Sequence, residues 1–263
     1  MGVSPVTTAD KVAAREFADV LDVPLLPVAS SAADFASDKI LLAVEAGLPA
    51  IVLAGRNAPG PVRVDFADRA LAARRRSGHN ELLGRAVGWK AKRAPSILDT
   101  TGGFGRDAFL LADLGCDVLL CERQPLMAQL LAAALQRALA SGDDWLCAVC
   151  KRMTLHRGDA DEIGAARLRS REVIYLDPMF PADRRSAPAK EMQVLHRLLA
   201  ESGDSEDDGS ELFAWALQQP VRRVVVKRPR RAPPLPGPAP GHSLRGRSVR
   251  FDVYPRPAPP DQT

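Results

Sequence analysis

The chain has 263 residues, of which 46% are hydrophobic, so it can bury a substantial core and is not a disordered tail. No apolar run approaches the ~20 residues that cross a bilayer, and the early charged residues argue against a secretory signal, so we expect a cytoplasmic protein. The net charge of +4 is modest, and four cysteines are too few for a disulfide scaffold in a chain of this length.

The first third of the chain predicts a small α/β domain. Apolar residues recur at helical spacing first, and three short apolar runs follow, separated by turns rich in glycine and proline. The expected elements are a helix at 9–21, strands at 40–45, 50–54 and 62–66, and one or two helices between 68 and 90. We therefore expect a small N-terminal domain at 1–68 and a larger domain at 69–263.

From residue 95 onward, apolar runs of strand length alternate with longer segments of helical pattern. The expected strands are 96–98, 118–121, 153–156, 173–176 and 221–226. The expected helices begin near 105 and cover 125–140, a short stretch after 156, 190–200 and 211–218. Such alternation predicts a parallel sheet joined by right-handed crossovers, and its near-continuous apolar strands predict burial on both faces.

The last two predicted strands, at 242–246 and 248–254, have no room for a crossover helix between them and must pair antiparallel. An otherwise parallel sheet that ends in a hairpin resembles the layout of class I methyltransferases. The predicted fold class is therefore α/β: a Rossmann-like, mostly parallel sheet with an antiparallel C-terminal hairpin, preceded by a small N-terminal α/β domain.

A glycine-containing loop, from Asp99 to Asp107, follows the first strand of this sheet, where open α/β sheets bind ligands. Gly103 and Gly105 let the backbone approach a ligand closely. The loop resembles the methyltransferase pattern of an acid followed by three alternating glycines, with Thr101 in the first glycine position. Asp107, in the first helical turn, disfavours a pyrophosphate and suits a cationic or zwitterionic ligand such as S-adenosylmethionine. A dinucleotide site and a turn that binds nothing remain alternatives for the loop alone.

Two further acids follow the next predicted strands in order. Glu122 ends the second strand, where a carboxylate can accept both ribose hydroxyls of a nucleoside. Asp159, preceded by Gly158, follows the third strand, where a side chain can meet an adenine amine. Acids at three successive strand ends together predict a site for a nucleoside cofactor.

The segment from Asp177 to Pro181 follows an apolar strand with an acid, a rigid turn and an aromatic ring. It resembles the D/N-P-P-Y/F motif of methyltransferases that modify amino groups on bases, with Met179 in place of the second proline. An exocyclic amine is a poor nucleophile because its lone pair is delocalised into the ring. Asp177 can accept its N–H groups, Pro178 can hold the turn rigid, and Phe180 can stack on a flipped base. The alternative is a polar turn beside a buried phenylalanine.

Five basic clusters lie in connectors or at the ends of predicted elements. They lie at 74–76, 90–93, 184–185, 227–231 and 245–250. If they converge on one face they would hold a phosphate backbone, whereas a single cluster is more often a solvated loop tip. Lys227 and Arg228 would lie beside the catalytic turn, and we predict that they contact RNA phosphate.

Cys147 and Cys150 form a Cys-x-x-Cys pair. A zinc site would need a second pair or histidines at ligand spacing, and neither lies close by in the sequence. We therefore expect the pair to lie on one face of a helix, and we expect no metal cofactor.

Several motifs together resemble a single methyltransferase family. They are the loop at 99–109, the Glu-Arg pair at 122–123, Asp-Pro-Met-Phe-Pro at 177–181, Lys-Glu-Met at 190–192 and Val-Val-Val-Lys-Arg-Pro at 224–229. Between about residues 60 and 254 the chain is similar to the bacterial small-subunit ribosomal RNA guanine-N2 methyltransferases. Arg74 and Arg75 lie inside this similarity and are candidate RNA contacts.

This resemblance implies methyl transfer from S-adenosylmethionine to the N2 of a guanine near the 3′ end of the small-subunit RNA. It implies the RNA or the small ribosomal subunit as the partner. The cofactor positions that it implies are Arg106, Asp107, Glu122, Arg123, Gly158, Asp159 and Asp177.

Two other functions fit the same residues. An amino methyltransferase acting on DNA or on a protein glutamine would use the same turn, and parallel assays of DNA, naked RNA and ribosomal subunits would discriminate them. A non-catalytic RNA-binding module on the same scaffold predicts loss of Asp177 or of the glycine loop, and both are present.

Overall fold

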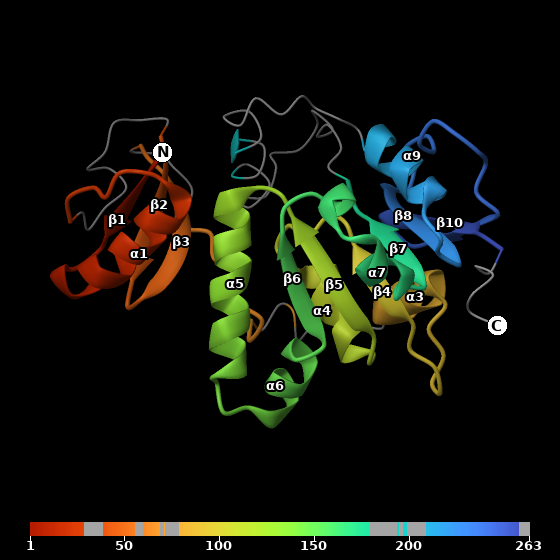
Figure 1. The fold of residues 1–263 in the computed structure, drawn as a ribbon, viewed down its shortest axis with the longest axis horizontal. Coiled ribbons are helices and arrows are strands. Elements are labelled where there is room, and N and C mark those ends of the chain that lie inside the picture. The colour runs from red at the N-terminus through yellow and green to blue at the C-terminus, as the bar shows by residue number, and fades with distance from the viewer. Residues whose placement is uncertain are drawn as a thin grey trace. The chain divides into compact units, whose positions relative to one another are not determined.

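The computed structural model describes residues 1–28, 39–55, 60–68, 71, 79–178, 194, 197–198 and 209–257. The chain divides into two compact units (Figure 1). The first contains Met1–Val64 and Pro125–Ala134, and the second contains Asp65–Gln124, Leu135–Met179 and Asp207–Thr263. Among the described residues, no helix is both long and apolar enough to cross a membrane.

The first unit is built around a three-stranded sheet in the order β1-β2-β3. Its strands are β1 (Gly2–Pro5), β2 (Ile40–Glu45) and β3 (Leu48–Leu53). β1 is parallel to β2, and β2 is antiparallel to β3. Helix α1 (Lys11–Leu21) follows a 3-10 turn at Thr8–Asp10. The sequence predicted α1, β2 and β3 but not β1, whose four residues are too few to show a clear period.

The second unit holds a seven-stranded sheet in the order β6-β5-β4-β7-β8-β10-β9. Its strands are β4 (Ser96–Asp99), β5 (Asp117–Glu122), β6 (Met153–Arg157), β7 (Val173–Leu176), β8 (Arg223–Pro229), β9 (His242–Arg245) and β10 (Val249–Pro255). The five strands from β6 to β8 are parallel, whereas β10 is antiparallel to both β8 and β9. The prediction of a mostly parallel sheet with an antiparallel C-terminal hairpin is confirmed.

The helices after residue 78 alternate with these strands along the chain. They are α3 (His79–Val87), α4 (Arg106–Asp113), α5 (Pro125–Leu139), α6 (Asp144–Cys150), α7 (Ala165–Arg169) and α9 (Ser210–Gln218). A second short 3-10 turn, at Ala160–Glu162, follows β6. Pro125 begins α5, where its missing N–H has no intrahelical partner to lose and its fixed φ suits the first turn.

Some predicted elements differ from the structure or lie outside the described residues. The strand predicted at 62–66 is wrong: in this described stretch only Val62 bridges to another strand, pairing with Ile51 of β3. The helix predicted at 190–200 lies largely outside the described residues, as does most of the predicted helical segment before α3.

The apolar side chains of the central strands in the larger sheet are buried by the surrounding elements. Fully buried side chains include those of Ile97, Leu98, Leu119, Leu120, Ile174, Val224 and Val225. Phe213 of α9 packs against Tyr254 of β10 with ring centroids 4.8 Å apart, and Phe109 of α4 stacks on Phe66 at 5.2 Å. Each fully buried side chain of this size contributes roughly 1.5–3 kcal/mol, so this core holds the strand ends in fixed positions.

Candidate functional site

The candidate site lies at the carboxyl ends of β4 and β7, where the strand order reverses. β4 pairs with β5 on one side and with β7 on the other, so the connections that leave β4 and β7 diverge. Asp99 ends β4, and Asp177 follows the last residue of β7. Open α/β sheets bind ligands at such a switch point, and here it brings two acids to the same edge.

Thr101 connects these two strand ends. Its hydroxyl accepts a hydrogen bond from the backbone N–H of Asp177 at 2.7 Å and donates one to Asp99 Oδ1 at 3.3 Å. Its backbone N–H donates to the same Asp99 oxygen at 3.0 Å. A glycine at this position would offer no hydroxyl. The residue that departs from the glycine pattern therefore fixes the backbone where the Asp177 turn begins, a role that the sequence did not indicate.

The loop between β4 and α4 approaches β5 closely at Gly102. The Gly102 N–H donates to the carbonyl oxygen of Cys121 at 2.7 Å, and a Cβ at Gly102 would lie 2.7 Å from that oxygen. Gly103 and Gly105 have φ values of 51° and 68°, which favour glycine. The sequence predicted close approach at Gly103 and Gly105 but not at Gly102, because two adjacent glycines do not show which of them lies against the neighbouring strand.

Two carboxyl groups, the buried Asp99 and the half-buried Glu122, lie at the ends of neighbouring strands. Burial raises the pKa of Asp99, and likewise that of Glu122, to about 7. Glu122 Oε2 accepts a hydrogen bond from the Gly103 N–H at 2.7 Å, and its Oε1 accepts one from the Gln124 N–H at 2.8 Å. The end of β5 thus presents a carboxyl group held in place by backbone donors on both sides.

The end of β6 adjoins the same edge. The Gly158 N–H donates to the Glu122 carbonyl oxygen at 3.0 Å, and Gly158 has a φ of 143°. Asp159 and Arg123 are exposed, while the half-buried Arg106 lies over the ring of Phe104, 5.3 Å from its centroid. The structure therefore brings the predicted residues on the first three strands to one edge of the sheet, with Asp159 and Arg123 facing solvent.

Lys227 of β8 bridges two acids at the centre of the site. Its Nζ donates to Asp107 Oδ2 at 2.7 Å and to Asp177 Oδ2 at 2.6 Å. Tyr175 of β7 donates its hydroxyl to the same Asp107 oxygen at 2.7 Å. Burial acts to lower the pKa of Lys227, but the carboxylates of Asp107 and Asp177 outweigh it and raise that pKa above its ordinary value. Lys227 is therefore held as a cation between the first turn of α4 and the turn after β7.

The neighbouring Arg228 also points into the protein. Its side chain is buried, and its Nε and Nη2 donate to the carbonyl oxygen of Pro233 at 3.0 and 2.8 Å. This geometry lends no support to the predicted contacts of Lys227 and Arg228 with RNA phosphate, because both side chains are engaged within the chain. Directly after β8, Arg230 and Arg231 face solvent.

Gly209 packs closely against Pro178. Pro178 is buried, and a Cβ at Gly209 would lie 2.4 Å from the Pro178 Cβ. Gly209 precedes α9 with a φ of 83°, a conformation that other residues rarely adopt. The start of α9 therefore supports the Asp177–Pro178 turn. Phe180 and Met179, like Arg74 and Arg75, lie outside the described residues.

Substitution of Gly209 by alanine is expected to displace this turn and to slow the reaction by up to about 10²-fold, since a shift of about 1 Å has that effect in active sites. Gly142→Ala is the matched control, because Gly142 has a φ of 74° but nothing within 4 Å of its Cβ position. Both variants place a side chain at a residue with a positive φ, and the resulting loss in the free energy of unfolding is measured by urea denaturation. Equal activity in the two variants would contradict a supporting role for Gly209.

The two cysteines of the Cys-x-x-Cys pair lie on α6. Cys150 is buried, and the Cys147 thiol donates to the carbonyl oxygens of Ala138 and Leu139 at 3.4 and 3.3 Å. Within the described part of the chain, no group of three or more histidine, cysteine, aspartate or glutamate side chains is arranged to hold a metal ion. The burial of Cys150 and the contacts of the Cys147 thiol indicate that the pair contributes to the packing of α6.

Comparison with known proteins identifies relatives along most of the chain. Residues 33–256 match a family described as "Putative SAM-dependent methyltransferase". A protein of Pseudomonas aeruginosa named ribosomal RNA small subunit methyltransferase J is 44% identical over 249 residues, covering 94% of this chain and 91% of the relative. A protein of the same name from Coxiella burnetii is 46% identical over 203 residues, covering 76% and 77%.

A solved structure is similar to this chain in both fold and sequence. It is a protein of Neisseria gonorrhoeae described as the SAM-dependent methyltransferase NGO1261. The alignment has a TM-score of 0.69 and 32% identity, and it covers 100% of this chain and 98% of the other. The strand order and the family match thus agree on a methyltransferase sheet.

Proposed function

Because the chain belongs to the ribosomal RNA small subunit methyltransferase J family, we propose that it methylates the exocyclic N2 amine of a guanine in small-subunit ribosomal RNA, using S-adenosylmethionine. The observation that carries this proposal is the Asp177 carboxylate at the switch point of the sheet, at the start of the turn after β7. The substrate is the RNA or the small ribosomal subunit, which agrees with the predicted cytoplasmic location.

The residues at this edge fit S-adenosylmethionine, which supplies a methyl group activated by a positively charged sulfur. Acids follow the strand ends, whereas a pyrophosphate at the start of α4 would meet Asp107, so the lining favours a cationic cofactor over a dinucleotide. Glu122 would accept the ribose hydroxyls, and Asp159 would accept the adenine amine. The backbone at Gly103 would lie against the cofactor.

The guanine amine needs an acceptor because its lone pair is delocalised into the ring. Asp177 would accept one of its N–H groups and direct the lone pair toward the methyl donor. Lys227, 2.6 Å from Asp177 Oδ2, favours the ionised carboxylate and holds its orientation. Thr101 and Gly209 fix the backbone on either side of Asp177, so the acceptor is positioned before the base arrives. Stacking of the base on Phe180 stays a prediction.

The proposal is tested by mapping the methylated base. Small subunits from a strain that lacks the protein are incubated with the enzyme and methyl-labelled S-adenosylmethionine, and the labelled nucleoside is identified by mass spectrometry. We expect a single N2-methylguanine in the small-subunit RNA. Double-stranded DNA and a glutamine-containing protein substrate serve as parallel arms, and label in either of these, or on another atom of the base, would contradict the proposal.

A further inference from the structure

A pocket of about 480 Å³ lies beyond the carboxyl end of β8, between the following loop and the β9–β10 hairpin. Its lining is strongly basic, because it includes Arg230, Arg231, Arg245 and Arg250 together with the acid Asp252. Arg230, Arg231 and Arg245 are exposed, whereas Arg250 and Asp252 are buried. The pocket therefore has a buried floor and a cationic rim.

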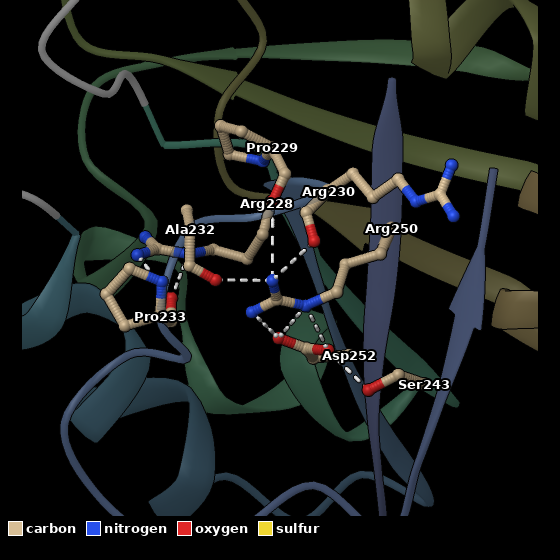
Figure 2. A network of polar contacts seen from close by, with 8 residues as sticks. All are labelled: Arg228, Pro229, Arg230, Ala232, Pro233, Ser243, Arg250 and Asp252. Carbon is tan, nitrogen blue, oxygen red and sulfur yellow. Dashed lines mark hydrogen bonds and ion pairs between the residues drawn. The ribbon is translucent and has the colours of Figure 1, made fainter. Parts of the chain in front are cut away.

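The floor of the pocket is a network of hydrogen bonds among Arg250, Asp252 and Ser243 (Figure 2). Arg250 Nε lies 2.9 Å from Asp252 Oδ1, and its Nη2 lies 2.9 Å from Asp252 Oδ2. Ser243 of β9 donates its hydroxyl to Asp252 Oδ1 at 2.6 Å. Asp252 is thus neutralised by Arg250 and bound by Ser243, so it does not offset the charge of the rim.

Two buried arginines hold the loop after β8 in place. Arg250 Nη1 donates to the carbonyl oxygens of Pro229 and Arg230 at 3.3 and 3.2 Å, and also to that of Ala232. Arg228 binds the carbonyl of Pro233 from the other side of the loop. Prolines at 229, 233, 234, 236, 238 and 240 further limit this segment. The loop is therefore rigid, and its outward side chains start from fixed backbone positions.

The register of the hairpin places three arginines in one row. Arg250 of β10 lies opposite Arg228 of β8 on one side and opposite Arg245 of β9 on the other. Side chains directly opposite each other in antiparallel strands share a face, so this row extends from the buried Arg228 through Arg250 to the exposed Arg245. Figure 2 shows the Arg230 side chain extending away from the network, not into it.

We propose that this pocket binds the phosphodiester backbone of the RNA substrate, away from the base that is methylated. The inference rests on the proposed function and names a contact surface for it. Arg230 follows Lys227 by three residues, or about 10 Å along an extended strand, so the rim lies at the same end of the sheet as the candidate site. Guanidinium groups bind phosphate oxygens through paired N–H donors, and the held loop backbone lowers the ordering cost of binding.

The test replaces the three rim arginines by glutamine, as Arg230→Gln, Arg231→Gln and Arg245→Gln in one protein. Binding of an end-labelled small-subunit RNA transcript is measured by filter retention across a salt series. We expect at least about tenfold weaker binding and a salt slope that is smaller by about 2, since each lost phosphate contact removes about 0.7–0.9 from the slope. Binding of S-adenosylhomocysteine, measured by calorimetry, and thermal unfolding are expected to match the wild type.

A second triple variant loses the same charge elsewhere. Lys11, Arg15 and Lys151 are exposed and lie outside the pocket, and their substitution by glutamine provides the matched control. An unchanged salt slope in the rim variant, or an equal change in the control, would overturn the inference. Wild-type enzyme that binds the transcript but leaves small-subunit RNA unmethylated would instead contradict the proposed function.

Discussion

Asp177→Ala is expected to lower the single-turnover rate of methyl transfer by about 10²–10⁴-fold, the range found for positioned groups that exchange or accept protons. The carboxylate is the acceptor proposed for the guanine amine, and alanine removes both of its oxygens. The backbone bond from the residue 177 N–H to Thr101 does not depend on the side chain and is retained, so the turn is expected to stay in place. The rate is measured with methyl-labelled S-adenosylmethionine and small subunits at saturating concentrations.

The matched variant is Asp177→Asn, which keeps one acceptor oxygen but loses the negative charge opposite Lys227. We expect it to retain more activity than the alanine variant, since one N–H of the amine can still be accepted. Binding of S-adenosylhomocysteine is measured for both variants to separate chemistry from cofactor affinity. An alanine variant within threefold of the wild-type rate would overturn the mechanism.

Lys227→Met is expected to destabilise the protein by about 2–4 kcal/mol at neutral pH and to slow methyl transfer at least about tenfold. The substitution leaves the Asp107 and Asp177 carboxylates facing each other without the ammonium that now binds both. The expected loss is below that of a fully buried pair because the Asp177 side chain is 35% exposed. The free energy of unfolding is measured by urea denaturation.

The pH dependence of the stability that Lys227 contributes follows from the direction in which its pKa is shifted. Because the pKa of Lys227 is raised in the folded protein, its contribution is fully present below the ordinary lysine pKa of about 10.4 and is lost only as the pH rises further. The difference in stability between Lys227→Met and wild type is therefore expected to persist throughout the neutral range.

A double variant tests the cause of this destabilisation. Asp107→Asn combined with Lys227→Met leaves one carboxylate in place of two, and the asparagine oxygen can still accept the Tyr175 hydroxyl. We expect the double variant to recover at least about 1 kcal/mol relative to Lys227→Met alone. A double variant that is less stable than the single variant would show that charge repulsion is not the cause.

Most of the larger sheet could be predicted from the sequence because its strands are short, apolar and separated by helical segments of clear period. The C-terminal hairpin was predictable for a simpler reason: a connection of a few residues admits only antiparallel pairing. The strand predicted at 62–66 was wrong because an apolar run also fits an extended segment that buries Val62 and Phe66 without a full ladder.

The site was predictable only where function follows from position at a strand end. Asp99, Glu122 and Asp177 each end or follow a strand, so topology alone brings them together. The role of Lys227 was not predictable in this way, because its partners are 120 and 50 residues away in the chain. A lysine beside an arginine is typical of a solvent-exposed basic cluster, and only the folded structure shows which acids face the lysine.

The position of β10 has a consequence for how the protein is made. Residues 249–255 leave the ribosome after every other strand of the larger sheet, yet β10 lies between β8 and β9. The strands that carry Asp99, Glu122 and Asp177 can pair earlier during synthesis, since domains form in order as the chain emerges. Arg250, which anchors the basic loop, arrives only with β10. A nascent chain can therefore assemble the proposed cofactor site before it possesses the surface proposed to hold RNA.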